Sequence, residues 1–162
     1  MIMTPKKIMR TTVFTTLFIL ALSIGSYGQD YQTGIGIRGG LSNGLTIKHF
    51  TQEGVALEGI AAFRWGGFHF TGLYEIHEPA FDTERLKWFY GGGAHLGVWD
   101  TDSPFVDGDS QAVIGIDGII GLEYSLEEIP FSISADWKPG FNLIGNTGFW
   151  GDEAAVSVRY IF

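Results

Sequence analysis

AAVSVRYIF, residues 154–162, ends the sequence and indicates the fold of the whole chain. Counting back from the last residue, every second position is apolar: Phe162, Tyr160, Val158, Val156 and Ala154. The positions between them form a mostly polar set that includes Arg159 and Ser157. An alternation with a period of two is typical of a β-strand with one apolar face and one polar face.

The same alternation recurs along the chain in eight segments, and no segment after residue 29 shows a sustained helical period. The segments cover residues 31–41, 44–51, 55–65, 68–77, 85–99, 112–125, 131–143 and 152–162. The connections between them are too short to carry a parallel crossover helix, so we expect an antiparallel meander. Closing such a sheet removes its exposed edges. The sequence therefore predicts an all-β fold, an eight-stranded antiparallel up-and-down barrel.

Turn residues and loops separate the segments. We expect connections at residues 42–44, 66–67, 79–84, 100–111, 126–130 and 144–151, the first two as tight hairpins of Gly and Asn. Pro139 lies inside the seventh segment and cannot donate a ladder hydrogen bond. A closed barrel has no edge strand to accommodate it, so we expect a bulge there, or the end of the strand near Lys138.

Charged residues occupy the polar face of nearly every segment, with equal numbers of each sign. They are Arg38, Lys48, Arg64, Lys87, Lys138 and Arg159 against Glu58, Glu75, Asp117, Glu123, Asp136 and Glu153. The chain as a whole is acidic, so this balance predicts that these charges pair with one another. The interior of an eight-stranded barrel is just filled by side chains, and buried charges need partners. We therefore expect the polar face inside as a network of ion pairs, and the apolar face outside as in a transmembrane barrel.

The alternative is a soluble barrel with its apolar face inward, in the manner of a lipocalin. The aromatic residues favour the membrane, because most lie near strand ends, where transmembrane barrels carry interfacial girdles. These residues are Trp65, Trp88, Trp99, Trp137, Trp150, Tyr124, Tyr160 and Phe162.

The first 28 residues have the pattern of a secretory signal peptide. Lys6, Lys7 and Arg10 precede an apolar run over 13–24, and small residues stand at positions 26 and 28. The run is too short for a membrane-spanning helix. We expect a signal peptide at residues 1–28 and a single barrel domain at residues 29–162. No cysteine is present to carry a lipoprotein anchor.

The composition of residues 29–162 excludes some functions. They contain all 18 acidic residues and seven of the ten basic ones, a net charge of −11. Such a domain is a poor nucleic-acid binder, because neutralising phosphates requires Lys and Arg. Without cysteines, an exported domain of this size must be held together by packing or by a bilayer.

Two motifs suggest ligands only weakly. Residues 34–39 match GxGxxG, but they lie inside a predicted strand with no helix behind them, so we expect no nucleotide site. These glycines, like Gly91, Gly93 and Gly97, are expected to make room in a crowded lumen. Residues 100–109 gather four carboxylates, yet their spacing does not match an EF-hand. We expect a solvated acidic loop, with divalent ions bridging it to lipopolysaccharide as the alternative, and no metal or cofactor site.

Three histidines are candidates for a catalytic role. His69, His77 and His95 share the inward parity with Glu75 and Asp117, and a His–acid pair beside a Ser is what a hydrolase would need. A barrel enzyme that modifies lipid would place these groups on its outer surface instead. We therefore expect no enzymatic activity. His49 has the outward parity, near a rim.

Residues 29–162 resemble the small outer-membrane β-barrel families of Gram-negative bacteria, in the architectural class of outer membrane proteins A and X. The resemblance depends on the signal-like N-terminal pattern, on the eight alternating segments and on the terminal Arg159-Tyr160-Ile161-Phe162. The resemblance implies a place in the cell outer membrane, among outer-membrane lipid and lipopolysaccharide. It also implies insertion by the barrel-assembly machinery, with Val158, Tyr160 and Phe162 as the assembly signal.

The resemblance implies no specific activity. We expect a monomer with a structural or interaction role and no wide channel. The alternatives are a narrow pore or small-ligand-binding barrel and, after that, a lipid-modifying barrel enzyme.

Overall fold

The chain forms one closed antiparallel sheet. The computed structural model describes residues 31–64, 67–81, 83–99, 111–145 and 147–162, without the side chains of Arg64, Glu84, Trp99 and Gln111. The predicted signal peptide (1–28), the acidic loop (100–109) and the side chains of Arg64, Trp65 and Trp99 therefore lie outside the described residues. No helix in the described ranges is long and apolar enough to cross a membrane.

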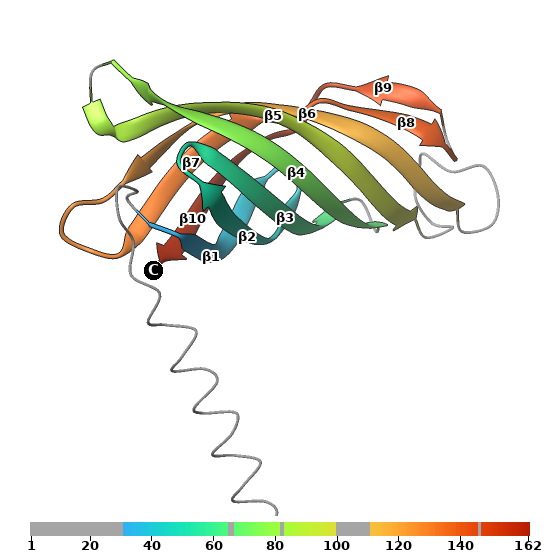
Figure 1. Ribbon diagram of the computed structural model, residues 1–162. Helices are drawn as coiled ribbons and strands as arrows, with labels where there is room; N and C mark the ends of the chain where they lie inside the picture. Colours follow the sequence, from blue (N-terminus) through green and yellow to red (C-terminus); the bar gives the residue numbers. More distant parts are fainter. Residues whose placement is uncertain (1–30, 65–66, 82, 100–110, 146) are drawn as a thin grey trace, which may run out of the picture.

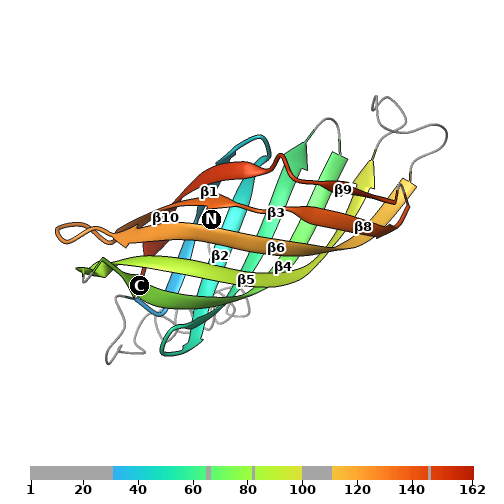
Figure 2. The ribbon, with the colours of Figure 1, turned by 90° about the horizontal axis from the view of Figure 1, so that it is seen from above.

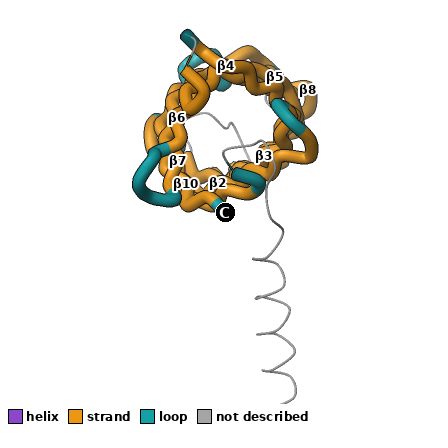
Figure 3. Tube along the Cα trace, turned by 60° about the vertical axis from the view of Figure 1, so that its left-hand side comes forward, coloured by secondary structure: helices purple, strands orange, loops and turns teal. Residues whose placement is uncertain are grey.

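Ten strand segments make up the sheet. They are β1 (Thr33–Gly40), β2 (Asn43–Gln52), β3 (Val55–Arg64), β4 (Gly67–Ala80), β5 (Thr83–Trp99), β6 (Gln111–Ser125), β7 (Phe131–Trp137), β8 (Gly140–Ile144), β9 (Gly148–Trp150) and β10 (Ala154–Ile161). From β1 to β7 each strand pairs antiparallel with the next, β7 pairs with β10, and β10 pairs with β1. This last pairing, from Gly34↔Ile161 to Gly40↔Ala155, closes the ring that Figure 3 shows.

The ten segments correspond to eight barrel strands. β7 and β8 both pair with β6 and are separated only by Lys138 and Pro139, while β9 and β10 pair with β8 and β7. The predicted eight-stranded antiparallel barrel is therefore confirmed, and so is the interruption near Lys138. At the break the Lys138 amide donates to the Glu153 carbonyl over 2.8 Å, and the Pro139 carbonyl accepts from the Gly118 amide over 2.9 Å.

Two predicted connections are wrong. Residues 144–151 were expected to be a loop, but β9 pairs with β8 in a hairpin that turns at Gly145, whose φ is 89°. Residues 79–84 were also expected to be a loop, but β4 and β5 remain paired as far as Ala80↔Thr83. The last β3–β4 pair is Val55↔Ile76, so β4 has a free edge beyond it, and Pro79 is tolerated there.

The two ends of the barrel differ. The terminal end carries the C-terminus and the β2–β3, β4–β5 and β6–β7 hairpins, whereas the loop end carries the β1–β2 and β8–β9 hairpins (Figures 1 and 2). The wall also varies in length, since β5 has 17 residues and β1 has 8.

The apolar face of the sheet points outward and the polar face points inward. Ile37 is 64% exposed, whereas the next residue, Arg38, is 2% exposed. Large exposed side chains from the other strands include Leu45, Leu57, Phe63, Phe70, Tyr74, Leu96, Ile116, Leu122, Ile133 and Tyr160. This polarity is the reverse of that in a water-soluble protein, whose large apolar side chains are mostly inside.

Inward glycines allow neighbouring strands to approach closely. A Cβ added at Gly93 would lie 1.9 Å from the carbonyl oxygen of Gly72, and one added at Gly36 would lie 1.9 Å from that of Val158. The obstacle is thus the backbone of the adjacent strand. We had expected these glycines to make room for luminal side chains, and the structure gives this different reason at both positions.

Gly93→Ala should therefore destabilise the barrel. The methyl group would force β4 and β5 apart, at a cost of about 1–3 kcal/mol, as for other overpacked sites. Gly72→Ala is the matched control, because its Cβ would point outward and meet nothing within 4 Å. Urea unfolding in detergent or lipid measures both. An equal loss of stability in the two variants would contradict the close approach.

Candidate functional site: two charge clusters inside the barrel

Five charged side chains meet in the half of the lumen nearer the terminal end. This terminal-end cluster consists of Lys48, Glu58, Glu75, Glu123 and Arg159, from β2, β3, β4, β6 and β10. The Lys48 Nζ lies 3.2, 2.8 and 3.0 Å from carboxylate oxygens of Glu58, Glu75 and Glu123. None of the five side chains is more than 4% exposed, so the ion pairs are dry.

Arg159 connects the closing strand to this cluster. Its Nη2 lies 2.5 Å from Glu58 Oε1, and its Nη1 lies 3.4 Å from Glu123 Oε2 and 2.8 Å from Ser134 Oγ. Its Nε donates to Thr46 Oγ1 over 3.3 Å. All three guanidinium nitrogens therefore have partners, as a buried arginine requires.

Hydroxyl groups complete the coordination of the carboxylates. Thr46 donates to Glu58, and Tyr31 donates to Glu123. Burial raises the pKa of the Tyr31 hydroxyl well above its usual value, and the charge of Glu123 raises that pKa further. Tyr31 therefore remains a hydrogen-bond donor.

Aromatic rings surround the terminal-end cluster. The Lys48 Nζ lies 4.2 Å from the centroid of the Phe89 ring, within range of a cation–π interaction. His77 stacks on Phe89 at 4.9 Å, and its Nε2 lies 3.0 Å from Glu75 Oε2. Phe50 packs against His77 at 4.9 Å and against Tyr31 at 5.1 Å. These rings keep water from the charges, which strengthens each charged hydrogen bond.

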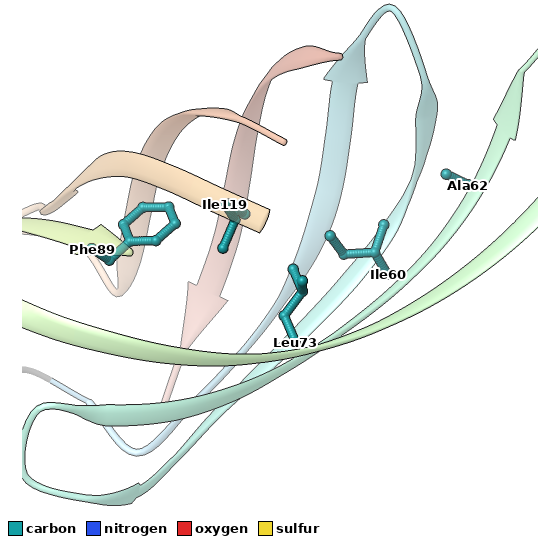
Figure 4. Close-up of a cluster of buried hydrophobic side chains, with 5 residues drawn as sticks. All are labelled: Ile60, Ala62, Leu73, Phe89 and Ile119. Carbon is teal, nitrogen blue, oxygen red and sulfur yellow. The ribbon is translucent and has the colours of Figure 1, made fainter. Parts of the chain in front are cut away.

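An apolar layer lies deeper in the lumen, next to this cluster. It consists of Ile60, Ala62, Leu73, Phe89 and Ile119 (Figure 4), all at most 5% exposed. Along β6, Ile119 stands between Asp117 and Glu123, so apolar atoms separate the charges of the two barrel halves. This layer was not predicted from the sequence, because the whole inward face was expected to be polar.

A second group of charges, the loop-end cluster, lies nearer the opposite end. It consists of Arg38, Asp117, Asp136, Lys138 and Glu153. Arg38 binds Asp136 through two nitrogens, at 2.6 and 2.7 Å, a geometry that is strong and directional. The Lys138 Nζ bridges Asp117 at 3.1 Å and Glu153 at 3.3 Å.

His95 extends the loop-end cluster. The indole N–H of Trp150 can only donate, so it orients the Asn142 Oδ1, which lies 3.2 Å from it, as an acceptor. The same oxygen lies 2.9 Å from His95 Nε2, which must therefore donate as well. His95 Nδ1 lies 2.7 Å from Asp117 Oδ2, on a carboxylate also bound by Lys138. Both ring nitrogens of His95 therefore lie against hydrogen-bond acceptors, which fixes the orientation of the ring between β6 and β8.

The structure brings together ten of the twelve charged residues predicted for the lumen, five in each cluster. Lys87 is only partly buried, and its Nζ lies 6.0 Å from the Phe50 ring centroid. The Arg64 side chain lies outside the described residues. Val158, Tyr160 and Phe162 point outward and are 37%, 47% and 40% exposed.

The clusters are suited to holding the barrel together. Across the ranges that the structure describes, no three His, Asp or Glu side chains are arranged to hold a metal ion. His69, His77 and His95 are buried inside, as their parity predicted. On the outer face, exposed His49 lies 2.9 Å from the hydroxyl of Thr33.

No protein-family model, curated protein or solved structure matches the chain.

Arg159→Gln should destabilise the barrel strongly. It leaves Glu58 and Glu123 with too few cations in a dry interior, and breaking a buried pair costs about 3–5 kcal/mol. Arg85→Gln is the matched control, because the Arg85–Glu127 pair, 3.4 Å apart, is exposed and such pairs contribute only about 0–1 kcal/mol. Equilibrium unfolding in detergent measures both variants. Similar losses would argue against a buried, paired interior.

Proposed function

We propose that this protein is an integral outer-membrane β-barrel with a structural or interaction role and a lumen closed by ion pairs. The observation that carries the proposal is the orientation of the two faces, with apolar side chains exposed outside and charges buried inside. In water such an outer surface would be an aggregation hazard. Surrounded by hydrocarbon, it is the lower-energy arrangement.

The closed sheet supports the same proposal. Hydrocarbon offers no hydrogen bonds to the backbone, so a spanning sheet must have no free edge in that region. Here β1 and β10 pair across the seam, and β5 and β6 pair over most of their length. The N-terminal pattern at residues 1–28 fits export across the inner membrane.

The proposed partners are outer-membrane lipid and lipopolysaccharide, with the barrel-assembly machinery during insertion. The outward row Val158, Tyr160 and Phe162 is exposed, so these side chains are accessible to a receptor on the last strand. Tyr160 packs edge-on against Phe131 of β7 at 5.6 Å. We propose a monomer, because the ring closes within one chain.

The filled interior supports a role other than transport through a wide channel. Lys48, Glu75, Phe89 and Arg159 are all fully buried, so at their level the described side chains leave no water-sized path beside them. A narrow pore is the second candidate, because paired charges can separate and re-pair.

The Ile37→Arg variant tests whether lipid or water surrounds the apolar outer face of the barrel. In a bilayer, an arginine on the lipid face near the midplane costs about 2–4 kcal/mol. In water, a surface substitution usually changes the free energy of unfolding by no more than about 0.5 kcal/mol. Phe81→Arg is the control, because Phe81 is 84% exposed at the tip of the β4–β5 hairpin, outside the proposed hydrocarbon region. Unfolding from lipid vesicles measures both, and an unaffected Ile37→Arg would rule out a lipid-facing surface.

Single-channel recording tests the closed lumen. In planar bilayers the wild-type barrel should give no stable conductance steps, because both charge clusters fill the interior. Regular steps in the wild type would instead support the narrow pore.

A further inference from the structure

The wall of the barrel is unequal in height around the ring. β1 has 8 residues and β2 has 10, whereas β4, β5 and β6, on the opposite side, have 14, 17 and 15. A strand tilted by about 45° needs about 9–11 residues to cross the hydrocarbon of a bilayer. β1 is therefore shorter than that length, and the strands opposite it exceed it.

The outward apolar rows differ in the same way. On β1 and the residue that follows it, the row runs from Ile35 to Leu41, whereas on β6 it runs from Ile114 to Tyr124. With a rise of about 3.3 Å per residue and a tilt of about 45°, the two rows extend about 14 Å and about 23 Å along the barrel axis. The apolar band of a transmembrane barrel is about 25 Å tall. The β6 side matches that band, and the β1–β2 side, called the low side below, does not.

Polar groups occupy the loop end of the low side. The chain turns at Leu41 and Ser42, and the exposed Asn43 begins β2. Beside this turn the Ser42 hydroxyl donates to Glu153 Oε1 over 2.8 Å, and the neighbouring Asp152 is exposed. A carboxylate at hydrocarbon depth is costly, so hydrocarbon that rises as far as this turn is energetically unfavourable.

A strand edge above the turn adds to this penalty. The last ladder pair between β1 and β10 is Gly40↔Ala155, so no residue of β1 lies beside the chain that leads from β9 into β10. Among the described strands, β9 pairs only with β8 and lies beyond the β1–β2 hairpin (Figures 1 and 2). Its other edge leaves backbone N–H and C=O groups without a strand partner, and hydrocarbon offers such groups no hydrogen bonds.

Tilting the barrel in the membrane does not remove the difference in height. A tilt raises or lowers both ends of one side of the wall together, so the height of that side stays almost unchanged. The bilayer has to adjust instead. Local thinning is an established response of a bilayer to an apolar surface that is too short for it.

We propose that the barrel thins the bilayer beside β1 and β2, where lipid head groups of the loop-end leaflet descend to the level of Asn43 and Asp152. This inference rests on the membrane location proposed above. On the opposite side, exposed apolar side chains such as Leu96 and Ile114 keep the leaflet at its ordinary thickness. The partner of the low side is therefore the head-group layer, and a lipid that moves around the barrel meets a step in its leaflet.

Depth-dependent fluorescence quenching in phosphatidylcholine vesicles tests this inference. The sequence contains no cysteine, so a fluorophore can be attached specifically to a Leu41→Cys variant on the low side or to an Ile116→Cys variant on β6. Both native side chains are 52% exposed. Leu41 lies eight residues from Thr33, at the terminal end of β1, and Ile116 lies eight residues from Tyr124, near the terminal end of β6. The two labels therefore stand at similar heights on the barrel.

The vesicles carry a quencher either on the lipid head group or near the end of an acyl chain. The Leu41→Cys label should be quenched more strongly from the head group, and the Ile116→Cys label more strongly from the chain end. The ratio of the two quenching efficiencies should therefore reverse between the variants. Both substitutions alter outward side chains, and unfolding by urea in the same vesicles verifies that each variant is folded.

Two results would overturn the thinning alone. Stronger quenching from the chain end at both positions would mean that the bilayer keeps its thickness beside β1 and β2. Little quenching of the Leu41→Cys label by either quencher would mean that no lipid lies there. In both cases the Ile116→Cys label still reports hydrocarbon, so the membrane location stands. If the chain-end quencher affects neither label, the membrane location is wrong and the thinning is refuted with it.

Discussion

The structure depends on charges that are removed from water and must therefore satisfy one another. A closed ring of eight strands leaves an interior that side chains just fill. Because the apolar faces point outward, polar groups are left to fill most of that interior. Lys48 and Arg159 each reach carboxylates from at least two other strands, so each cation ties together parts of the wall that do not pair directly. Loss of either would remove contacts all around the ring.

The strand pattern was predictable because a period of two is a local property of the backbone. Arg159 lies between outward Val158 and Tyr160, and no arrangement of the rest of the chain can turn it to their side of the sheet. The break at Pro139 was predictable for a similar reason, because proline has no backbone N–H and so interrupts the hydrogen-bond ladder of any strand that contains it. The balance of charges on one face predicted pairing, although it did not predict which charges would pair.

Which charged side chains pair inside the barrel depends on strand tilt and register, and the alternation of apolar and polar residues does not encode these. Glu58 meets Lys48 directly across from it, but it meets Arg159 only because β10 closes the ring over two intervening strands. The apolar layer around Phe89 was missed because parity gives the side of a residue and not its neighbours. The short β9 was missed because three residues are too few to show a period.

The seam between β1 and β10 has a consequence for how the molecule is made. Arg159 and Glu58 are separated by 101 residues, so their contact can form only when the final strand arrives. Contacts between such distant parts of a chain form slowly. Until then the acidic side chains of β3, β4 and β6 lack half of their counterions and must stay hydrated. An assembling barrel of this kind therefore has to keep a wet cleft open along its unjoined edges, and it expels that water only at the last step.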